Sequence, residues 1–180
     1  MTRFLTAAAA LAAALATTTA AQAATVVDFD EFKHNSVAKV YHDPVISKGF
    51  SFTSSYTVNG LAFWGPANSA DPDGAALLNW TGNGTTTVRR TDGGLFSLDA
   101  MDIADAYDRG VASEILFTFF DGMKTTTEAV TLDKLKGLQT FALGRGKLEW
   151  FSYSQMGNGG IQIDNVVLGT PVVSAVPEPG

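Results

Sequence analysis

The chain has 180 residues, with 12 Lys and Arg against 18 Asp and Glu, and it contains no cysteine. Its formal net charge of −6 disfavours nucleic-acid binding, because an acidic protein is repelled by a phosphate backbone. The lack of cysteine excludes disulfides, thiol nucleophiles and thiolate metal sites.

The first 23 residues have the three regions of a secretory signal peptide. A basic start with Arg3 precedes an alanine-rich run from Leu5 to Ala16, and small residues surround Gln22. We predict cleavage after Ala23, which leaves roughly 155 residues with a net charge of about −7, enough for one domain. No later apolar run approaches the roughly 20 residues that span a bilayer. The sequence therefore predicts an exported, soluble protein with one domain over residues 24–169.

From residue 25 onward, the apolar pattern has a period near 2, in short runs of β-branched and aromatic residues separated by Gly, Asn, Asp and Pro. In chain order, the predicted strands are Thr25–Phe32, Gly49–Val58, Ala75–Trp80, Thr85–Arg90, Leu95–Ile103, Ser113–Phe120, Thr126–Asp133, Gln139–Ala142, Lys147–Tyr153 and Gly160–Leu168. Asp92-Gly93 and Asp121-Gly122 predict hairpin or corner turns, because glycine takes positive φ cheaply. About ten short strands predict an all-β fold, an antiparallel β-sandwich. A short helix over Met101–Tyr107 is the minor alternative.

Two irregular segments, Lys33–Lys48 and Gly65–Gly74, are the longest predicted loops. Long loops on a rigid β scaffold commonly carry ligand or ion sites. The final stretch, residues 170–180, is small, Pro-containing and almost uncharged, which predicts a linker rather than part of the sandwich.

The end of the chain, Val176-Pro177-Glu178-Pro179, resembles the opening of the PEP-CTERM sorting signal of exported bacterial proteins. That signal continues into a hydrophobic segment and a basic cluster, which do not follow here, so we expect a chain truncated after the motif. The alternative is an accidental Pro-rich end. The resemblance implies a location at the bacterial cell surface or outside the cell, and processing by envelope sorting machinery.

A second resemblance runs through most of the mature chain and concerns the order of five short segments. They are Val27-Asp28-Phe29-Asp30, Lys48-Gly49-Phe50-Ser51-Phe52, Arg90 to Leu98, Leu138-Gln139-Thr140-Phe141 and Ile163-Asp164-Asn165-Val166-Val167. This order resembles the body of many PEP-CTERM proteins, which is similar to jelly-roll carbohydrate-binding modules. The resemblance implies a jelly-roll sandwich of galactose-binding-like type. It also implies a structural calcium ion held by an acidic residue near the first strand and an aspartate in the last.

For calcium, which prefers oxygen ligands, we expect Asp30 and Asp164 as metal ligands and Glu31 as a weaker third. Alternation along the first predicted strand would point Glu31 away from Asp30. The alternative is that these carboxylates are ordinary edge or solvent residues. The oxygen-rich stretch from Asn68 to Gly74 lacks the closing glutamate of a helix-loop-helix calcium site and is interpreted as an Asx-rich turn.

Sugar rings have apolar faces and hydroxyl-bearing edges, so a binding site needs aromatic platforms beside polar groups. Trp64 and Trp80 adjoin loops, and Tyr56 and Tyr107 lie near polar segments; these four are the predicted ligand-binding residues. The alternative is that the two indoles fill the core. Trp150 is predicted to be a core residue.

Signals for catalysis are weak. Asp99, Asp102, Asp105 and Asp108 recur every three residues, but a solvated acidic edge explains them better than a carboxylate pair. The two histidines, His34 and His42, are interpreted as exposed loop residues. The sequence thus predicts a non-catalytic exported protein that binds carbohydrate or exopolysaccharide. The alternatives are a structural biofilm or extracellular-matrix protein without a ligand pocket and, third, a divergent polysaccharide-acting enzyme.

Overall fold

The computed structural model describes residues 23–56, 58–80, 84–107, 112–156 and 159–169. The strands of this part are β1 (Thr25–Val27), β2 (Val40–Tyr41), β3 (Val45–Ser47), β4 (Phe50–Ser54), β5 (Leu61–Phe63), β6 (Leu77–Asn79), β7 (Thr85–Arg90), β8 (Phe96–Asp105), β9 (Glu114–Phe120), β10 (Thr125–Thr131), β11 (Gln139–Leu148), β12 (Trp150–Met156) and β13 (Ile161–Gly169). Nearly all of the predicted signal peptide and the whole predicted linker lie outside the described residues. Within the described ranges, no helix is long and apolar enough to cross a membrane.

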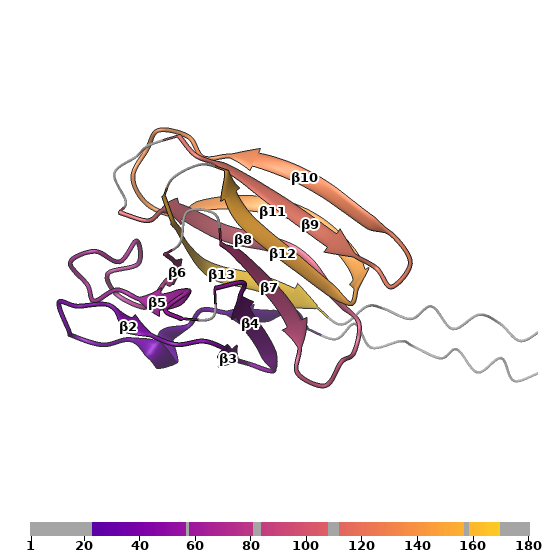
Figure 1. Cartoon of the computed structure of the whole chain (residues 1–180), viewed down its shortest axis with the longest axis horizontal. Helices are drawn as coiled ribbons and strands as arrows, with labels where there is room; N and C mark the ends of the chain where they lie inside the picture. The colour runs from indigo at the N-terminus through magenta and orange to yellow at the C-terminus, as the bar shows by residue number, and fades with distance from the viewer. Residues whose placement is uncertain (1–22, 57, 81–83, 108–111, 157–158, 170–180) are drawn as a thin grey trace, which may run out of the picture.

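Two antiparallel sheets pack face to face (Figure 1). The seven-stranded sheet has the order β11-β8-β13-β6-β5-β2, with β1 also paired to β13. The six-stranded sheet has the order β10-β9-β12-β7-β4-β3. The chain passes back and forth between the sheets, as in a jelly roll. The predicted all-β sandwich is confirmed.

The ten predicted strands are all present, and the structure adds three short ones, β2, β3 and β5. Two of them, β2 and β3, lie inside the segment Lys33–Lys48 that the sequence predicted to be irregular. These short segments show no alternation of apolar and polar residues, so the sequence pattern does not reveal them. β2 and β3 form one edge of the seven-stranded and of the six-stranded sheet, respectively, and β5 pairs with β2.

Two local predictions are wrong. The first strand ends at Val27, not Phe32, because Phe29 has a left-handed backbone (φ 54°) and starts a 3-10 turn over Asp30–Phe32. Segment Met101–Tyr107 does not contain a helix, since β8 continues to Asp105. The reason is sheet pairing: β8 has β11 on one side and β13 on the other, and hydrogen bonds to both hold it extended.

Aromatic side chains dominate the core between the sheets. The phenylalanines with 2% exposure or less are Phe29, Phe52, Phe63, Phe96, Phe117, Phe119 and Phe151. Phe29 packs edge-to-face on Phe52 with ring centroids 5.1 Å apart. The left-handed turn at Phe29 therefore points its ring inward and joins the start of the domain to the core.

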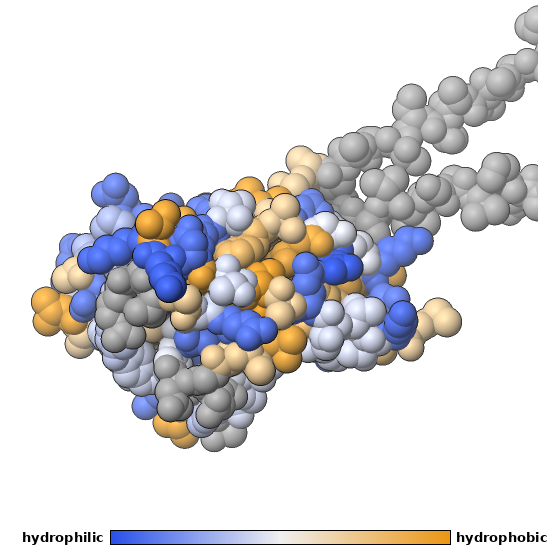
Figure 2. Space-filling view, turned by 90° about the horizontal axis from the view of Figure 1, so that it is seen from above, coloured by the Kyte–Doolittle hydropathy of each residue, from blue (hydrophilic) through white to orange (hydrophobic). Residues whose placement is uncertain are grey.

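The edge strands β10 and β11 belong to different sheets and are not paired with each other. From the side where they lie, the surface has an apolar area surrounded by hydrophilic residues (Figure 2). Arg145 of β11 forms an ion pair with Glu128 of β10. The Arg145 guanidinium carbon also lies 5.0 Å from the ring centroid of Phe119. This pair bridges the open edge of the sandwich and covers core aromatics.

Phe52→Ala should lower the free energy of unfolding by about 3–5 kcal/mol, because it removes a fully buried ring and leaves a cavity. Denaturant unfolding followed by intrinsic fluorescence measures the change. Met123→Ala, at a residue that is 94% exposed, is the control and should change stability by less than about 0.5 kcal/mol. Equal effects of the two substitutions would contradict the core described above.

Candidate functional site

Three of the four aromatic residues predicted to bind sugar come together on the outer face of the seven-stranded sheet. Trp64 follows β5, Trp80 follows β6, and Tyr107 lies just after β8. The ring centroids are 5.8 Å apart for Trp64 and Trp80, 5.6 Å for Trp80 and Tyr107, and 6.4 Å for Trp64 and Tyr107. We call these three residues the aromatic cluster. The fourth residue, Tyr56, is 43% exposed and has no ring contact with them among the described residues.

The cluster forms because strand alternation turns apolar residues outward beneath it. Ala62, Leu78 and Ala106 are buried and form a small apolar group against which Trp64 and Trp80 pack. Tyr107 is 44% exposed, whereas the two indoles are half-buried. The tryptophans therefore lie neither in the main core nor fully in solvent; they cover the outer face of the sheet.

A cation adds to the cluster. The Lys39 ammonium nitrogen lies 3.0 Å from the ring centroid of Trp80, 5.1 Å from that of Trp64 and 5.5 Å from that of Tyr41. Such an arrangement is favourable because the face of an aromatic ring is negative. No sequence pattern indicated Lys39, since the two-residue strand β2 that follows it is too short to predict.

A second feature is the acidic corner, which consists of Asp30, Asp71 and Asp164. Asp164 lies in β13 and is 1% exposed, and its Oδ1 has no hydrogen-bond partner among the described residues. A Cβ atom added to Gly74 would overlap a carboxylate oxygen of Asp71 and one of Asp30. The two carboxylates therefore meet above Gly74, and a side chain at this position would displace both.

Burial raises the pKa of Asp164 to about 8. The backbone N–H of Asn165 opposes this shift, whereas the negative charges of Asp71, Asp30 and Asp102 add to it. These repulsions show that the three carboxylates of the acidic corner are close enough to interact. Among the described residues, however, no three His, Asp or Glu side chains form a preassembled metal-binding group.

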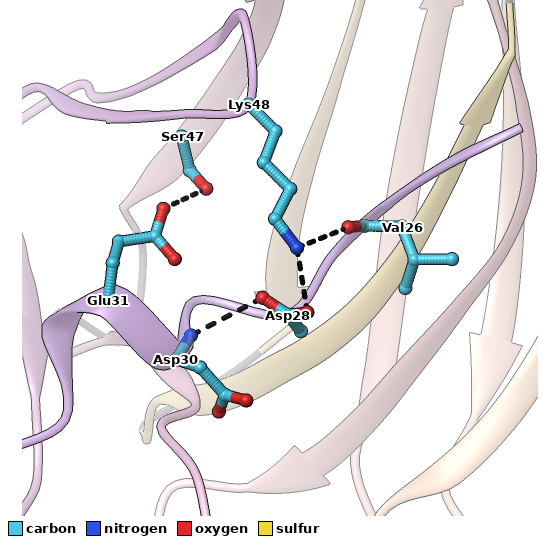
Figure 3. Close-up of polar contacts among 6 residues, drawn as sticks. All are labelled: Val26, Asp28, Asp30, Glu31, Ser47 and Lys48. Carbon is cyan, nitrogen blue, oxygen red and sulfur yellow. Dashed lines mark hydrogen bonds and ion pairs between the residues drawn. The ribbon is translucent and has the colours of Figure 1, made fainter.

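The carboxylates of Glu31 and Asp30, two of the predicted metal ligands, point in different directions (Figure 3). The Glu31 carboxylate accepts a hydrogen bond from the Ser47 hydroxyl, while the Asp30 carboxylate points away from both. Asp28 binds the Lys48 ammonium at 2.7 Å, and this contact lowers the pKa of Asp28. Asp30 thus remains directed toward the acidic corner, with Glu31 and Asp28 engaged elsewhere.

The Asx-rich turn predicted for Asn68–Gly74 is present, because the Asp73 N–H donates to Asp71 Oδ1 at 3.2 Å. The same segment is anchored to the sheet through Gln162, which is fully buried. The Gln162 amide accepts from the Ala70 N–H at 2.9 Å and donates to the Asn68 carbonyl at 3.0 Å. This anchoring places Asp71 in the acidic corner, a role that local sequence does not reveal.

The regularly spaced aspartates do not converge on a catalytic site. Asp99 is exposed, Asp102 accepts a hydrogen bond from Thr140 Oγ1 at 2.6 Å, and Asp105 accepts one from the backbone of Tyr107 at 3.0 Å. Asp108 lies outside the described residues. In an extended strand, a spacing of three alternates between faces, so Asp102 and Asp105 point to opposite sides of β8.

Both histidines are half-buried rather than exposed, which corrects the prediction. The His34 Nε2–H donates to the Phe63 carbonyl at 3.2 Å, and its Nδ1 accepts from the Ser36 N–H. His42 packs edge-on against Phe32 and Phe63. These contacts account for both side chains as packing and hydrogen-bonding residues of the first long loop.

The prediction that Trp150 is a core residue is wrong. Trp150 begins β12 and is half-buried on the outer face of the six-stranded sheet, stacked on Phe120 with centroids 5.5 Å apart. Glu149 alone links β11 to β12, so Leu148 and Trp150 belong to different sheets. Strand alternation cannot be carried across such a corner, which explains the error.

No protein-family model and no curated protein sequence matches this chain. Among solved structures, it is similar to the CBM32 of AlyQ in complex with 4,5-unsaturated mannuronic acid, with 15% identity and a TM-score of 0.45 over 72% of this chain and 97% of that one. A family 11 carbohydrate-binding module from Clostridium thermocellum in complex with a β-1,3-1,4-mixed-linked tetrasaccharide matches at 15% identity and a TM-score of 0.42, over 76% of this chain and 98% of that one. TmCBM61 in complex with β-1,4-galactotriose matches at 10% identity and a TM-score of 0.40, over 66% and 88%. Likenesses at this level assign no ligand to the present chain.

The raised pKa of Asp164 predicts a pH dependence of stability in the presence of a chelator. The folded state keeps a proton that the unfolded chain releases above about pH 4, so stability should fall as pH rises from 5 to 8 and then level off. The melting temperature of the wild type should be about 3–6 °C higher at pH 6 than at pH 8. Asp164→Asn should remove most of this difference; an unchanged pH slope in that variant would contradict the assignment.

Proposed function

We propose that this protein is a non-catalytic carbohydrate-binding domain and that the aromatic cluster is its sugar platform. The observation that carries the proposal is the convergence of Trp64, Trp80 and Tyr107 from three separate strand ends. Grouped rings on an outer sheet face present apolar area to the face of a pyranose. The exposed Tyr107 offers the most accessible ring of the three.

The polar half of the site comes from Lys39. Its ammonium group has three donors and lies directly over Trp80, so it is placed to donate hydrogen bonds to the hydroxyls of a sugar held against the rings. A small number of placed polar groups beside an apolar platform is the usual composition of a small-ligand site.

We place this function outside the cytoplasm, at the bacterial cell surface or in the extracellular medium. The supporting features are in the sequence: the signal-peptide pattern of residues 1–23 and the resemblance of Val176 to Pro179 to a PEP-CTERM sorting signal. The partners would be extracellular polysaccharide and, during export, the sorting and processing machinery of the envelope.

We also propose a structural calcium ion at the acidic corner. The donor chemistry fits, because Asp30 and Asp71 meet above Gly74 and the buried Asp164 Oδ1 lacks a partner among the described residues. Calcium would cancel the repulsion among three carboxylates and would hold the turn at Asn68–Gly74 against the sheet. Glu31 has no part in this proposal, since it binds Ser47.

One observation favours the alternative of a structural exopolysaccharide or biofilm-matrix protein without a defined ligand pocket. Lys39 already covers the face of Trp80, so this cluster could serve only to seal the outer face of the sheet. Hydrolysis by the regularly spaced aspartates has no such support, because Asp102 and Asp105 are used in separate contacts and Asp99 is exposed.

Trp80→Ala and Tyr107→Ala should each reduce retention of the protein in affinity gels at least tenfold, because each removes a stacking surface worth about 1.4 kcal/mol or more. The gels should contain a panel of bacterial and plant polysaccharides. Tyr56→Ala is the matched control, since its ring is equally exposed and lies outside the cluster. Circular dichroism establishes that each variant is folded. Retention of the wild type by no polysaccharide would favour the matrix alternative.

Millimolar calcium should raise the melting temperature by several degrees over the value in chelator, since a ligand bound only by the folded state stabilises it in proportion to the logarithm of its concentration. Asp71→Asn and Asp164→Asn should abolish this rise. Asp99→Asn, at an exposed carboxylate elsewhere on the domain, should leave it intact. A calcium effect of equal size in all three variants would show that the ion binds somewhere else.

A further inference from the structure

A row of hydroxyl side chains crosses the outer face of the six-stranded sheet. Directly paired residues of neighbouring strands project to the same face. In sheet order, the row consists of Thr53, Thr87, Ser152, Thr118 and Thr127. The residues that precede and follow them on the three central strands, such as Phe117, Val88 and Phe151, are buried in the core. The hydroxyls therefore face away from the core across five strands.

Next to this row lies an aromatic ledge, formed by Trp150 and Phe120. Their rings are stacked with centroids 5.5 Å apart and planes inclined by 26°. The Arg89 guanidinium carbon lies 5.6 Å from the ring centroid of Trp150. The Arg89 guanidinium therefore lies against the aromatic ledge.

A depression opens beside Arg89, with a volume of about 350 Å³. Apart from Arg89, its lining residues all carry hydroxyl groups: Ser51, Thr53, Ser54, Ser55 and Thr87. A lining of hydroxyls with one guanidinium can donate and accept many hydrogen bonds, and it contains no aromatic ring. The apolar contact for a ligand would come from the ledge at its side.

Arg89 differs from the other arginines of the described chain in having no carboxylate partner there. Arg90, the next residue, pairs with Asp92 at 2.5 Å, and Arg145 pairs with Glu128. An exposed guanidinium held on a tryptophan, with no carboxylate among the described residues to pair with it, can bind a ligand carboxylate through two parallel hydrogen bonds. Charge complementarity therefore indicates a carboxylate-bearing ligand.

We propose that this face binds a linear polysaccharide built from carboxylate-bearing sugars, that is, uronic acids. Arg89 takes a sugar carboxylate, the ledge of Trp150 and Phe120 provides apolar contact for a pyranose ring, and the threonines of the row bind the neighbouring units, whereas Ser152 is only 6% exposed. The site lies on the opposite sheet from the aromatic cluster and does not depend on it. Because the protein as a whole is negatively charged, it repels polyanions at long range, and affinity for one must come from a local site.

The test compares two forms of one polymer by affinity electrophoresis: polygalacturonate, with free carboxylates, and the same chain with its carboxylates methyl-esterified. The full chain is run without added divalent cations, so that metal ions cannot bridge protein and polymer. We expect retardation by polygalacturonate at least tenfold stronger than by the ester. Arg89→Gln and Trp150→Ala should each weaken binding of polygalacturonate about tenfold or more.

Two control variants separate binding at this face from binding elsewhere on the protein. Arg90→Gln removes a neighbouring positive charge that is already paired with Asp92, and it should leave binding unchanged. Trp80→Ala should also leave it unchanged, whatever happens to the binding of neutral sugars. Equal retention by the free and esterified polymers, no retention by either, or full retention of Arg89→Gln would each overturn the proposal. Heat denaturation of each variant verifies that lost binding does not reflect unfolding.

Discussion

The first half of strand β13, Ile161 to Asp164, is buried on both of its faces, and the positions of two loops beside the seven-stranded sheet depend on that burial. Its inward residues Ile161 and Ile163 lie in the core, while its outward residues Gln162 and Asp164 are equally hidden from solvent. A buried polar group is costly unless it is hydrogen-bonded. Gln162 meets this requirement by binding the backbone of the Asn68–Gly74 turn, and also the Ala106 carbonyl at 2.9 Å. These hydrogen bonds hold the Asn68–Gly74 turn against the sheet.

The hydrogen bonds of Gln162 help to position both candidate sites on the seven-stranded sheet, the aromatic cluster and the acidic corner. The bond from Gln162 to Ala106 holds the end of β8 just before Tyr107, beside the indoles that end β5 and β6. The hydrogen bonds from Gln162 to the Asn68–Gly74 turn bring Asp71 toward Asp164. Unlike Gln162, Asp164 is not fully hydrogen-bonded, because its Oδ1 has no partner among the described residues. One strand thus sets the positions of the aromatic cluster and the acidic corner.

The alternation of apolar and polar residues predicted most of the strands, and the positions where this prediction fails have local physical causes. All ten predicted strands exist, but β2, β3 and β5 are short and show no alternation of apolar and polar residues. At Phe29 a left-handed residue ends the alternation, and at Glu149 a single residue moves the chain to the other sheet. For the site, ring chemistry alone singled out Trp64, Trp80 and Tyr107. Lys39, Asp71 and the Arg89 face depend on contacts between distant segments, which no local pattern encodes.

Glycan binding on the aromatic surfaces can be measured directly, because the chain has three tryptophans and each lies on one of these surfaces. Each gives one indole N–H signal in a proton–nitrogen correlation spectrum of the labelled protein. Titration with neutral oligosaccharides should shift the signals of Trp64 and Trp80, and titration with oligogalacturonate should shift that of Trp150. Indole signals that stay in place with every sugar, while the protein remains folded, would contradict glycan binding at both surfaces.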